Sequence, residues 1–347
     1  MGHTTLTFPE TVSLPQLVEW NKLLWRPANE LEIRVNFCNT RFFTPFAMMF
    51  IISQIENYKT RYKAAIIVLE NYTYLTWPTK MGFFNALNSS VQGGRRLGGH
   101  ESAMNLHTDD FIPITTLLTK DFKEEYGRGL IEINEAVDRR AGLLTRTLTH
   151  LGSGYVFDTV QYSLREVMRN VFEHSGSEVL RYCAQYWAKT STVELIISDC
   201  GMGVHNSLIG NKSFATLKER DALHYACLPG VSGNQKAMRE RASANPWRNS
   251  GYGLYMTSRL CRNDGNFLII SSNHALVLKL DDKKDFHVTN TRGTLIRLHL
   301  KLKRDQNLRA NLAKYTEEGK GISEDIAGAQ VLEASAASQM LRRDFQD

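Results

Sequence analysis

The chain of 347 residues contains only five cysteines and no long apolar run. The cysteines form no CxxC pair and no spacing typical of a metal site, which favours a reducing compartment over a disulfide framework. The most apolar segment, FAMMFIISQI at residues 46–55, has about half the length of a membrane span. The sequence shows no signal peptide, and Leu6 breaks the pattern for N-myristoylation. We therefore expect a cytoplasmic protein with no membrane partner.

The common nucleotide and nucleic-acid signals are absent as well. No GxGxxG occurs at a strand-to-helix turn and there is no GxxxxGK[ST], which disfavours the Rossmann and P-loop folds. The net charge of +6 comes from 42 basic and 36 acidic residues without a basic run interleaved with aromatics, so nucleic acid is not indicated as a partner. A hydrophobic content of 42% over this length suits two domains.

The segment SLREVMRNVFEH, residues 163–174, has the period of an amphipathic helix. At about 100° per residue, its apolar side chains share one arc, and Glu166, Asn170 and Glu173 lie roughly opposite. Such a face is ordinarily solvated. Asparagine is a mediocre helix former, however, so Glu and Asn at i and i+4 suggest that these side chains have a specific function. The Asn170 amide oxygen suits Mg²⁺, and Glu166 could act as a general base. His174 could donate to a phosphate, or it is a surface or packing residue.

Two glycine boxes follow. An apolar run at residues 193–197 predicts a buried strand that ends at Asp199, before Gly201 and Gly203. A carboxylate there could accept from an exocyclic adenine amine while the glycines let backbone approach the ligand, although the pattern alone is also typical of an ordinary turn. Gly251 and Gly253 precede the apolar stripe of another predicted helix, and the free N–H groups of a helix N-terminus bind phosphate.

In this order, the boxes resemble those of the GHKL ATPases, the group that includes DNA gyrase, MutL, the ninety-kilodalton heat-shock chaperones and the histidine kinases. The ExxxN motif corresponds to Glu166 and Asn170, and the DxGxG motif to Asp199, Gly201 and Gly203. The GxGL motif corresponds to Gly251, Gly253 and Leu254. A glycine-threonine pair of the family corresponds to Gly293 and Thr294, which we expect to open the strand TLIRLHLKL. The resemblance covers about residues 108–302, in a domain placed at 108–303. It implies an α/β fold, an α+β sandwich of the GHKL or Bergerat type.

The resemblance also implies a role for each matched residue. Asn170 would hold Mg²⁺, Glu166 would be the base and Asp199 would read adenine. The pocket wall and phosphate contacts would come from Gly201, Gly203, Gly251, Gly253, Leu254 and Thr294. Residues of about 205–250 would form the ATP lid, a loop that is mobile when empty, with four cations as candidate phosphate contacts: Lys236, Arg239, Arg241 and Arg248.

The chain departs from the two-component histidine kinases. Those kinases carry a phospho-acceptor histidine on a helix before the ATP domain, and the predicted helix LIEINEAVDRRAGLLTRTLTHLG offers only His150. The acid or asparagine usual beside such an acceptor is missing. We therefore expect His150 to end a helix, without histidine autophosphorylation.

Residues 1–90 show a different sequence pattern. LEIRVNFCN and AAIIVLEN predict strands, and FAMMFIISQIENYK and TKMGFFNAL predict helices, which indicates a small α/β layer. Its order resembles a STAS domain, the module of anti-anti-sigma factors, with Thr44 as the nearest counterpart of their phosphorylated residue. Residues 91–107 predict a linker. Residues 304–347 predict a polar tail, helical or partner-docking, whose apolar residues are too sparse for a core: Leu308, Leu312, Val331, Leu332 and Met340.

Two classes of function remain open. In the first, the chain is an enzyme that uses ATP and Mg²⁺, either an ATPase that drives a conformational or assembly change, or a Ser/Thr protein kinase like the anti-sigma kinases. Its partner would be another protein or a second copy of itself. In the second, it is a nucleotide-gated binding module with little turnover. Glu166 favours turnover, because a degenerate sensor could lose the base.

Overall fold

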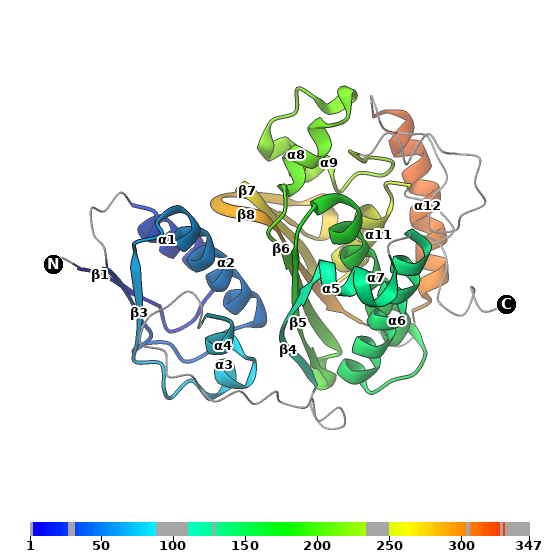
Figure 1. The fold of residues 1–347 in the computed structure, drawn as a ribbon. Helices are drawn as coiled ribbons and strands as arrows, with labels where there is room; N and C mark the ends of the chain where they lie inside the picture. The colour runs from blue at the N-terminus through cyan, green and yellow to red at the C-terminus, as the bar shows by residue number, and fades with distance from the viewer. Residues whose placement is uncertain are drawn as a thin grey trace.

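The computed structural model describes residues 3–26, 32–87, 110–127, 130–233, 250–302, 306–326 and 329. A five-stranded sheet with the order β4-β5-β6-β8-β7 forms the centre of the larger unit (Figure 1). Every neighbouring pair of strands is antiparallel. The strands are β4 (Phe111–Leu118), β5 (Val179–Trp187), β6 (Thr192–Asp199), β7 (Asn266–Leu278) and β8 (Lys284–Lys301). Seven of the eight residues of β6 are buried, because both faces of the sheet are covered.

Helices cover one face of this sheet. They are α5 (Thr119–Tyr126), α6 (Leu130–Thr149), α7 (Tyr155–Asn170) and α11 (Gly253–Arg262), whose apolar sides meet the sheet in one core. Thr149 is the last residue of α6, so the expectation that His150 follows the end of a helix is confirmed. The predicted strand of residues 193–197 is confirmed as part of β6.

The tail carries a further helix, α12 (Leu308–Glu324), that packs on α11 and α7. Leu308 and Leu312 are only 2% and 1% exposed and belong to the main core. The expectation that they are too sparse for a core is therefore wrong. They lie one turn apart, and with Tyr315 they form a single apolar stripe, so few residues suffice to seat the helix. The other tail residues, Val331, Leu332 and Met340, lie outside the described residues.

The N-terminal unit is the α/β layer predicted from its alternating pattern. Its strands β1 (His3–Thr7), β2 (Glu32–Asn36) and β3 (Ile66–Glu70) are parallel in the order β1-β2-β3, and α1 (Leu14–Leu24) and α2 (Pro45–Arg61) connect them. The helix expected at TKMGFFNAL is two short helices, α3 (Thr76–Lys80) and α4 (Phe83–Leu87). They break at Gly82, whose φ of 77° is a left-handed conformation that favours glycine.

The N-terminal unit packs on the second face of the large sheet, where α2 lies against β6 and β8 (Figure 1). Polar pairs fix this contact. Arg181 of β5 donates two hydrogen bonds to Glu56 of α2, at 2.9 and 3.0 Å. Gln54 of α2 donates to Thr291 Oγ1 of β8 at 2.7 Å. The sequence predicts two domains joined by a linker at 91–107, and this linker lies outside the described residues. The described parts of the two domains share one continuous interface.

The start of α2 carries Thr44, whose hydroxyl accepts a hydrogen bond from the Ala47 N–H at 3.1 Å. This is an N-cap, and Pro45 at the first helical position suits it. Glu194 of β6, with 1% of its surface exposed, approaches the same helix end: its Oε2 lies 3.5 Å from the Phe46 nitrogen, and its Oε1 accepts from Arg297 Nε at 2.6 Å. Thr44 therefore has a structural task in the fold.

Candidate functional site

One pocket on the helical face of the sheet brings most of the predicted residues together. Its empty volume is about 990 Å³, the open mouth included. Of the ten predicted site residues, nine line it: Glu166, Asn170, His174, Asp199, Gly203, Gly251, Gly253, Leu254 and Thr294. They come from α7, its extension, β6, the start of α8 (Gly203–Ile209), the loop before α11, α11 itself and β8.

Gly201 does not line this pocket. It packs against the backbone that follows α7, where a Cβ at Gly201 would lie 2.1 Å from the Ser175 carbonyl oxygen. The Met202 N–H donates to the same carbonyl at 2.9 Å. Gly201 therefore lets the turn after β6 approach α7 closely, which is a structural task beside the pocket.

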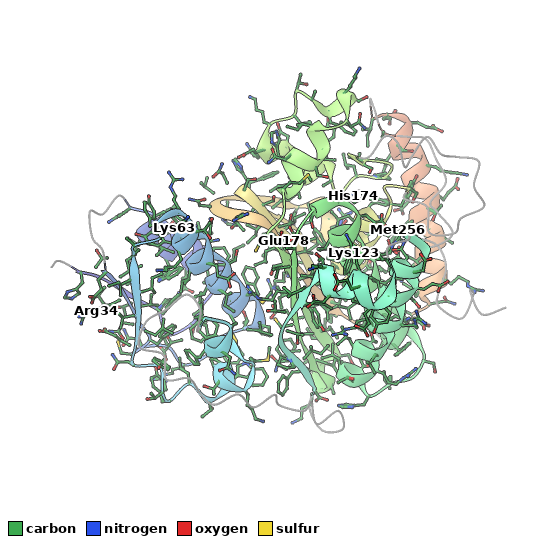
Figure 2. All side chains as sticks on the ribbon, in the orientation of Figure 1. Arg34, Lys63, Lys123, His174, Glu178 and Met256 are labelled. Atoms are coloured by element: carbon green, nitrogen blue, oxygen red, sulfur yellow. The ribbon has the colours of Figure 1, made fainter. Side chains whose placement is uncertain are left out.

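The end of α7 departs from a regular helix. Residues Val171–Ser175 form a π-helical turn that stops at Gly176, in left-handed conformation with φ 61°. Such turns are frequent at functional sites. His174 lies in this turn (Figure 2), and burial lowers the pKa of its imidazole, which favours a neutral ring. A neutral ring can donate one hydrogen bond toward the pocket and accept one.

The polar face of α7 is not a solvated face. Glu166 is 3% exposed, and its Oε1 accepts from Arg165 Nε at 3.2 Å and from Arg169 Nη1 at 3.4 Å. Arg165 also lies 3.6 Å from an oxygen of Asp138 on α6, and Arg169 bonds Glu173 at 3.1 Å. The carboxylate at the pocket is therefore neutralised by two buried guanidinium groups. No role for either arginine was predicted from the sequence. Their positions, one residue before and three residues after Glu166, were the signal that could have indicated a contact with its carboxylate.

The second oxygen of Glu166 faces the GxGL box. A Cβ built on Gly253, the first residue of α11, would lie 2.4 Å from Glu166 Oε2. Gly251, with φ 72°, adopts a left-handed conformation, and a Cβ there would lie 2.8 Å from the Gly230 carbonyl carbon. The two glycines thus hold this loop against α7 on one side and against the segment after α9 (Glu219–Tyr225) on the other.

Asp199 is the last residue of β6 and pairs with Thr294 of β8. Its Oδ1 accepts from the Gly201 N–H at 2.7 Å. Burial raises the pKa of the Asp199 carboxyl to about 6, and the hydrogen bonds from Gly201 and Thr294 oppose part of this increase.

The expectation that Gly293 and Thr294 open a strand is wrong. Both lie inside β8, which begins at Lys284, because the polar stretch before them also pairs with β7.

Asp199→Asn is expected to remove a pH dependence of the protein's stability. The folded state binds the Asp199 proton more tightly than the unfolded state, so stability falls as the pH rises from about 4 to about 6. A pKa change from 3.8 to about 6 corresponds to a loss of about 3 kcal/mol in the free energy of unfolding. The Asp199→Asn protein should not show this loss, because asparagine does not titrate. Urea unfolding of both proteins across this range measures the difference. A stability difference that does not change with pH would contradict the buried acid.

The described half of the expected lid is folded. It contains α8, a 3₁₀ turn at Lys212–Phe214 and α9, which enclose a small core of their own: Leu208, Phe214, Ala222 and Val231. Residues 205–233 therefore contain helical segments and are not a single loop, because these widely spaced apolar residues meet once the two helices pack. The mobility of the segment without nucleotide stays a prediction. The four candidate cations, Lys236, Arg239, Arg241 and Arg248, lie outside the described residues.

Comparison with models of protein families, with curated proteins and with solved structures finds no match to this chain. Within the described parts, no group of three His, Cys, Asp or Glu side chains is placed to hold a metal ion. None of the described helices combines the length and apolar character needed to cross a membrane.

Proposed function

We propose that this protein binds Mg²⁺-ATP in the pocket between α7, β6 and the start of α11, as a protein of the GHKL type. One observation carries the proposal. Nine residues chosen from sequence motifs for four ligand-binding tasks, spread from Glu166 to Thr294, line a single pocket. Chance placement of unrelated turns and helix faces would scatter them over the surface. The N-terminal unit, as a STAS-like module, belongs to the same proposal.

The residues present suit the nucleotide. Asn170 offers an amide oxygen of the kind that Mg²⁺ accepts, and Asp199 offers a carboxylate at the inner end of a buried strand. Gly251 and Gly253 keep side chains away from the N-terminus of α11, where backbone N–H groups suit phosphate. Bound Mg²⁺ would neutralise phosphate charge. Glu166 presents one oxygen toward this loop and would orient a nucleophile.

Hydrolysis would then drive a switch through the lid. Two hydrogen bonds join β7 to the described lid and to the residue before it: Val204 N–H donates to Ser271 Oγ at 2.9 Å, and Asn273 donates to Glu219 at 2.9 Å. The partner strand β8 contacts the N-terminal unit through Thr291. The β7–β8 hairpin therefore touches both the lid and α2, and a lid movement would reach the N-terminal unit, another protein or a second copy by this route.

A second candidate is a nucleotide-gated binding module with little turnover. The observation that favours it is the pairing of Glu166 Oε1 with both Arg165 and Arg169, which holds this oxygen in two ion pairs and leaves only Oε2 to contact a nucleophile. A protein kinase acting on Thr44 in the same chain has less support. Thr44 caps α2 on the sheet face opposite the pocket, and its hydroxyl already accepts a backbone hydrogen bond.

Calorimetric titration tests the proposal. We expect ATP to bind only with Mg²⁺ and more tightly than GTP, and Asp199→Asn to weaken ATP binding by about 1–3 kcal/mol because the exocyclic amine then meets a donor. A non-hydrolysable analogue is expected to slow proteolysis within residues 205–233 through closure of the lid. Equal affinity for ATP and GTP, or no binding, would remove the proposed function.

A further inference from the structure

A second cleft lies on the other face of the sheet, between the carboxyl-terminal half of α2 and the ends of β5 and β6. Its empty volume is about 1080 Å³, the open mouth included. Asp199 borders both this cleft and the nucleotide pocket, and its neighbours Ser198 and Cys200 line only the cleft. Because side chains alternate along β6, Ser198 points to the α2 face while Asp199 points to the helical face.

The cleft carries an excess of positive charge. Four basic residues line it, and the acids that line it are Glu56 and Asp199. Arg181 is committed to Glu56 by two hydrogen bonds, and Lys59 Nζ donates to the carbonyls of Lys63 and Ala65, where it closes the end of α2. Asp199 makes its hydrogen bond to Gly201 on the opposite face. The carbonyls hold the Lys59 ammonium in place without neutralising its charge, and the side chains of Lys63 and Arg292 remain available to a ligand.

Lys63 and Arg292 are both exposed, and neither side chain has a hydrogen-bond or ion-pair partner among the residues that the structure describes. Lys63 follows the end of α2 (Figure 2), and Arg292 precedes Gly293 in β8. One cation thus comes from each unit, and the hydroxyl-bearing side chains of Ser53 on α2 and Ser198 on β6 also line the cleft. Arginine presents a planar fork that matches phosphate oxygens, and lysine adds a compact point charge.

We propose that this cleft binds a compact phosphate-bearing small molecule, whose dianionic group is held by Lys63 and Arg292. The lining holds four basic and two acidic side chains, and this excess of two positive charges complements the charge of a phosphate monoester or free phosphate. The cleft is walled by α2 on one side and the sheet on the other, which suits a small molecule. The inference is separate from the proposed nucleotide function, because it uses no residue of the other pocket except the shared wall at Asp199.

Cys200 provides a reporter inside the cleft. Of the five cysteines, Cys183, Cys227 and Cys261 are buried, so Cys38→Ser leaves Cys200 as the one exposed thiol. Burial raises the pKa of the Cys200 thiol, so its alkylation by N-ethylmaleimide is followed at mildly alkaline pH by mass spectrometry. Inorganic phosphate or ribose 5-phosphate is titrated against chloride at equal ionic strength. Occupancy of the cleft is expected to slow alkylation in a saturable manner.

Lys63→Gln and Arg292→Gln, made in the Cys38→Ser background, are expected to raise the concentration for half-protection by roughly 10-fold each, the usual size of a lost charged hydrogen bond. Rates are normalised to each variant without phosphate. Lys123→Gln on α5, which does not line the cleft, serves as a matched control and should leave protection unchanged. Circular dichroism checks the fold, which substitutions at the exposed Lys63 and Arg292 and at the half-buried Lys123 should preserve.

The two probes distinguish the source of the phosphate group. Protection by ribose 5-phosphate at lower concentration indicates an ester, and protection by inorganic phosphate alone indicates the free ion; both uphold the site. The proposal is overturned if neither ion protects more than chloride, or if both variants keep full protection. Loss of protection in Asn170→Ala, with Arg292→Gln unaffected, would place the ion in the nucleotide pocket and also overturn it.

Discussion

Glu166→Ala is expected to lower phosphate release from ATP by roughly 10²–10⁴-fold, the usual size of general-base catalysis, while ATP still binds. The reason is that Glu166 Oε2 is the carboxylate oxygen nearest the glycine loop, where it would orient the nucleophile. Asn170→Ala should instead lower both binding and turnover, because it removes the proposed Mg²⁺ ligand. Phosphate release and calorimetry on the same preparations separate the two effects.

Glu173→Ala is the matched control, since it removes another carboxylate from the pocket that also pairs with Arg169. It should affect phosphate release far less than Glu166→Ala does. If Glu166→Ala releases phosphate at the wild-type rate, Glu166 is not the base. If the wild-type protein binds ATP with no measurable release, the nucleotide-gated module becomes the better description, and the two arginines on Oε1 explain it.

Gly253→Ala is expected to weaken ATP binding by about 10- to 100-fold. The added methyl group would lie 2.4 Å from Glu166 Oε2, so the buried carboxylate or the first turn of α11 must move. Overpacking of this kind usually costs about 1–3 kcal/mol. Calorimetric affinity for ATP and the urea midpoint of the variant measure the loss of binding and of stability together.

Gly321→Ala provides the comparison for that substitution. Gly321 lies in α12 with no atom within 4 Å of a built Cβ, so alanine should stabilise the protein by about 0.5–1 kcal/mol through helix propensity. ATP affinity should not change. Equal ATP affinity in Gly253→Ala and wild type would show that the start of α11 tolerates a side chain, and the phosphate assignment of that loop would fail.

Local patterns predicted the elements that hold the pocket. The strand that ends at Asp199, the helix with Glu166 and Asn170, and the helix that starts at Gly253 each carry their own periodicity or glycine signal within about a dozen residues. The antiparallel register that sets Thr294 opposite Asp199 is a long-range property. The resemblance to a known family supplied the expectation that these residues meet, and the geometry brings them together.

Other features depend on contacts that no local pattern carries. The π turn that contains His174 spans only five residues at the end of α7, too few to show a period of their own. The burial of Arg165 and Arg169 depends on ion pairs with Asp138 from α6 and with Glu173, which no local pattern reveals. The position of α12 likewise depends on its partners, since Gly319 fits beneath Tyr252 and Tyr255.

The attachment of the N-terminal unit to the second face of the sheet has a practical consequence. That face carries buried apolar side chains of the larger unit, which cluster with those of α1 and α2: Cys183, Ile196, Leu268, Ile270, Ala275, Val277 and Leu295. A truncated chain that begins near residue 108 would leave this surface in water. Exposed apolar patches of this kind drive aggregation. We therefore expect the larger unit to be poorly soluble without residues 3–87, because their packing keeps this face of the sheet out of water.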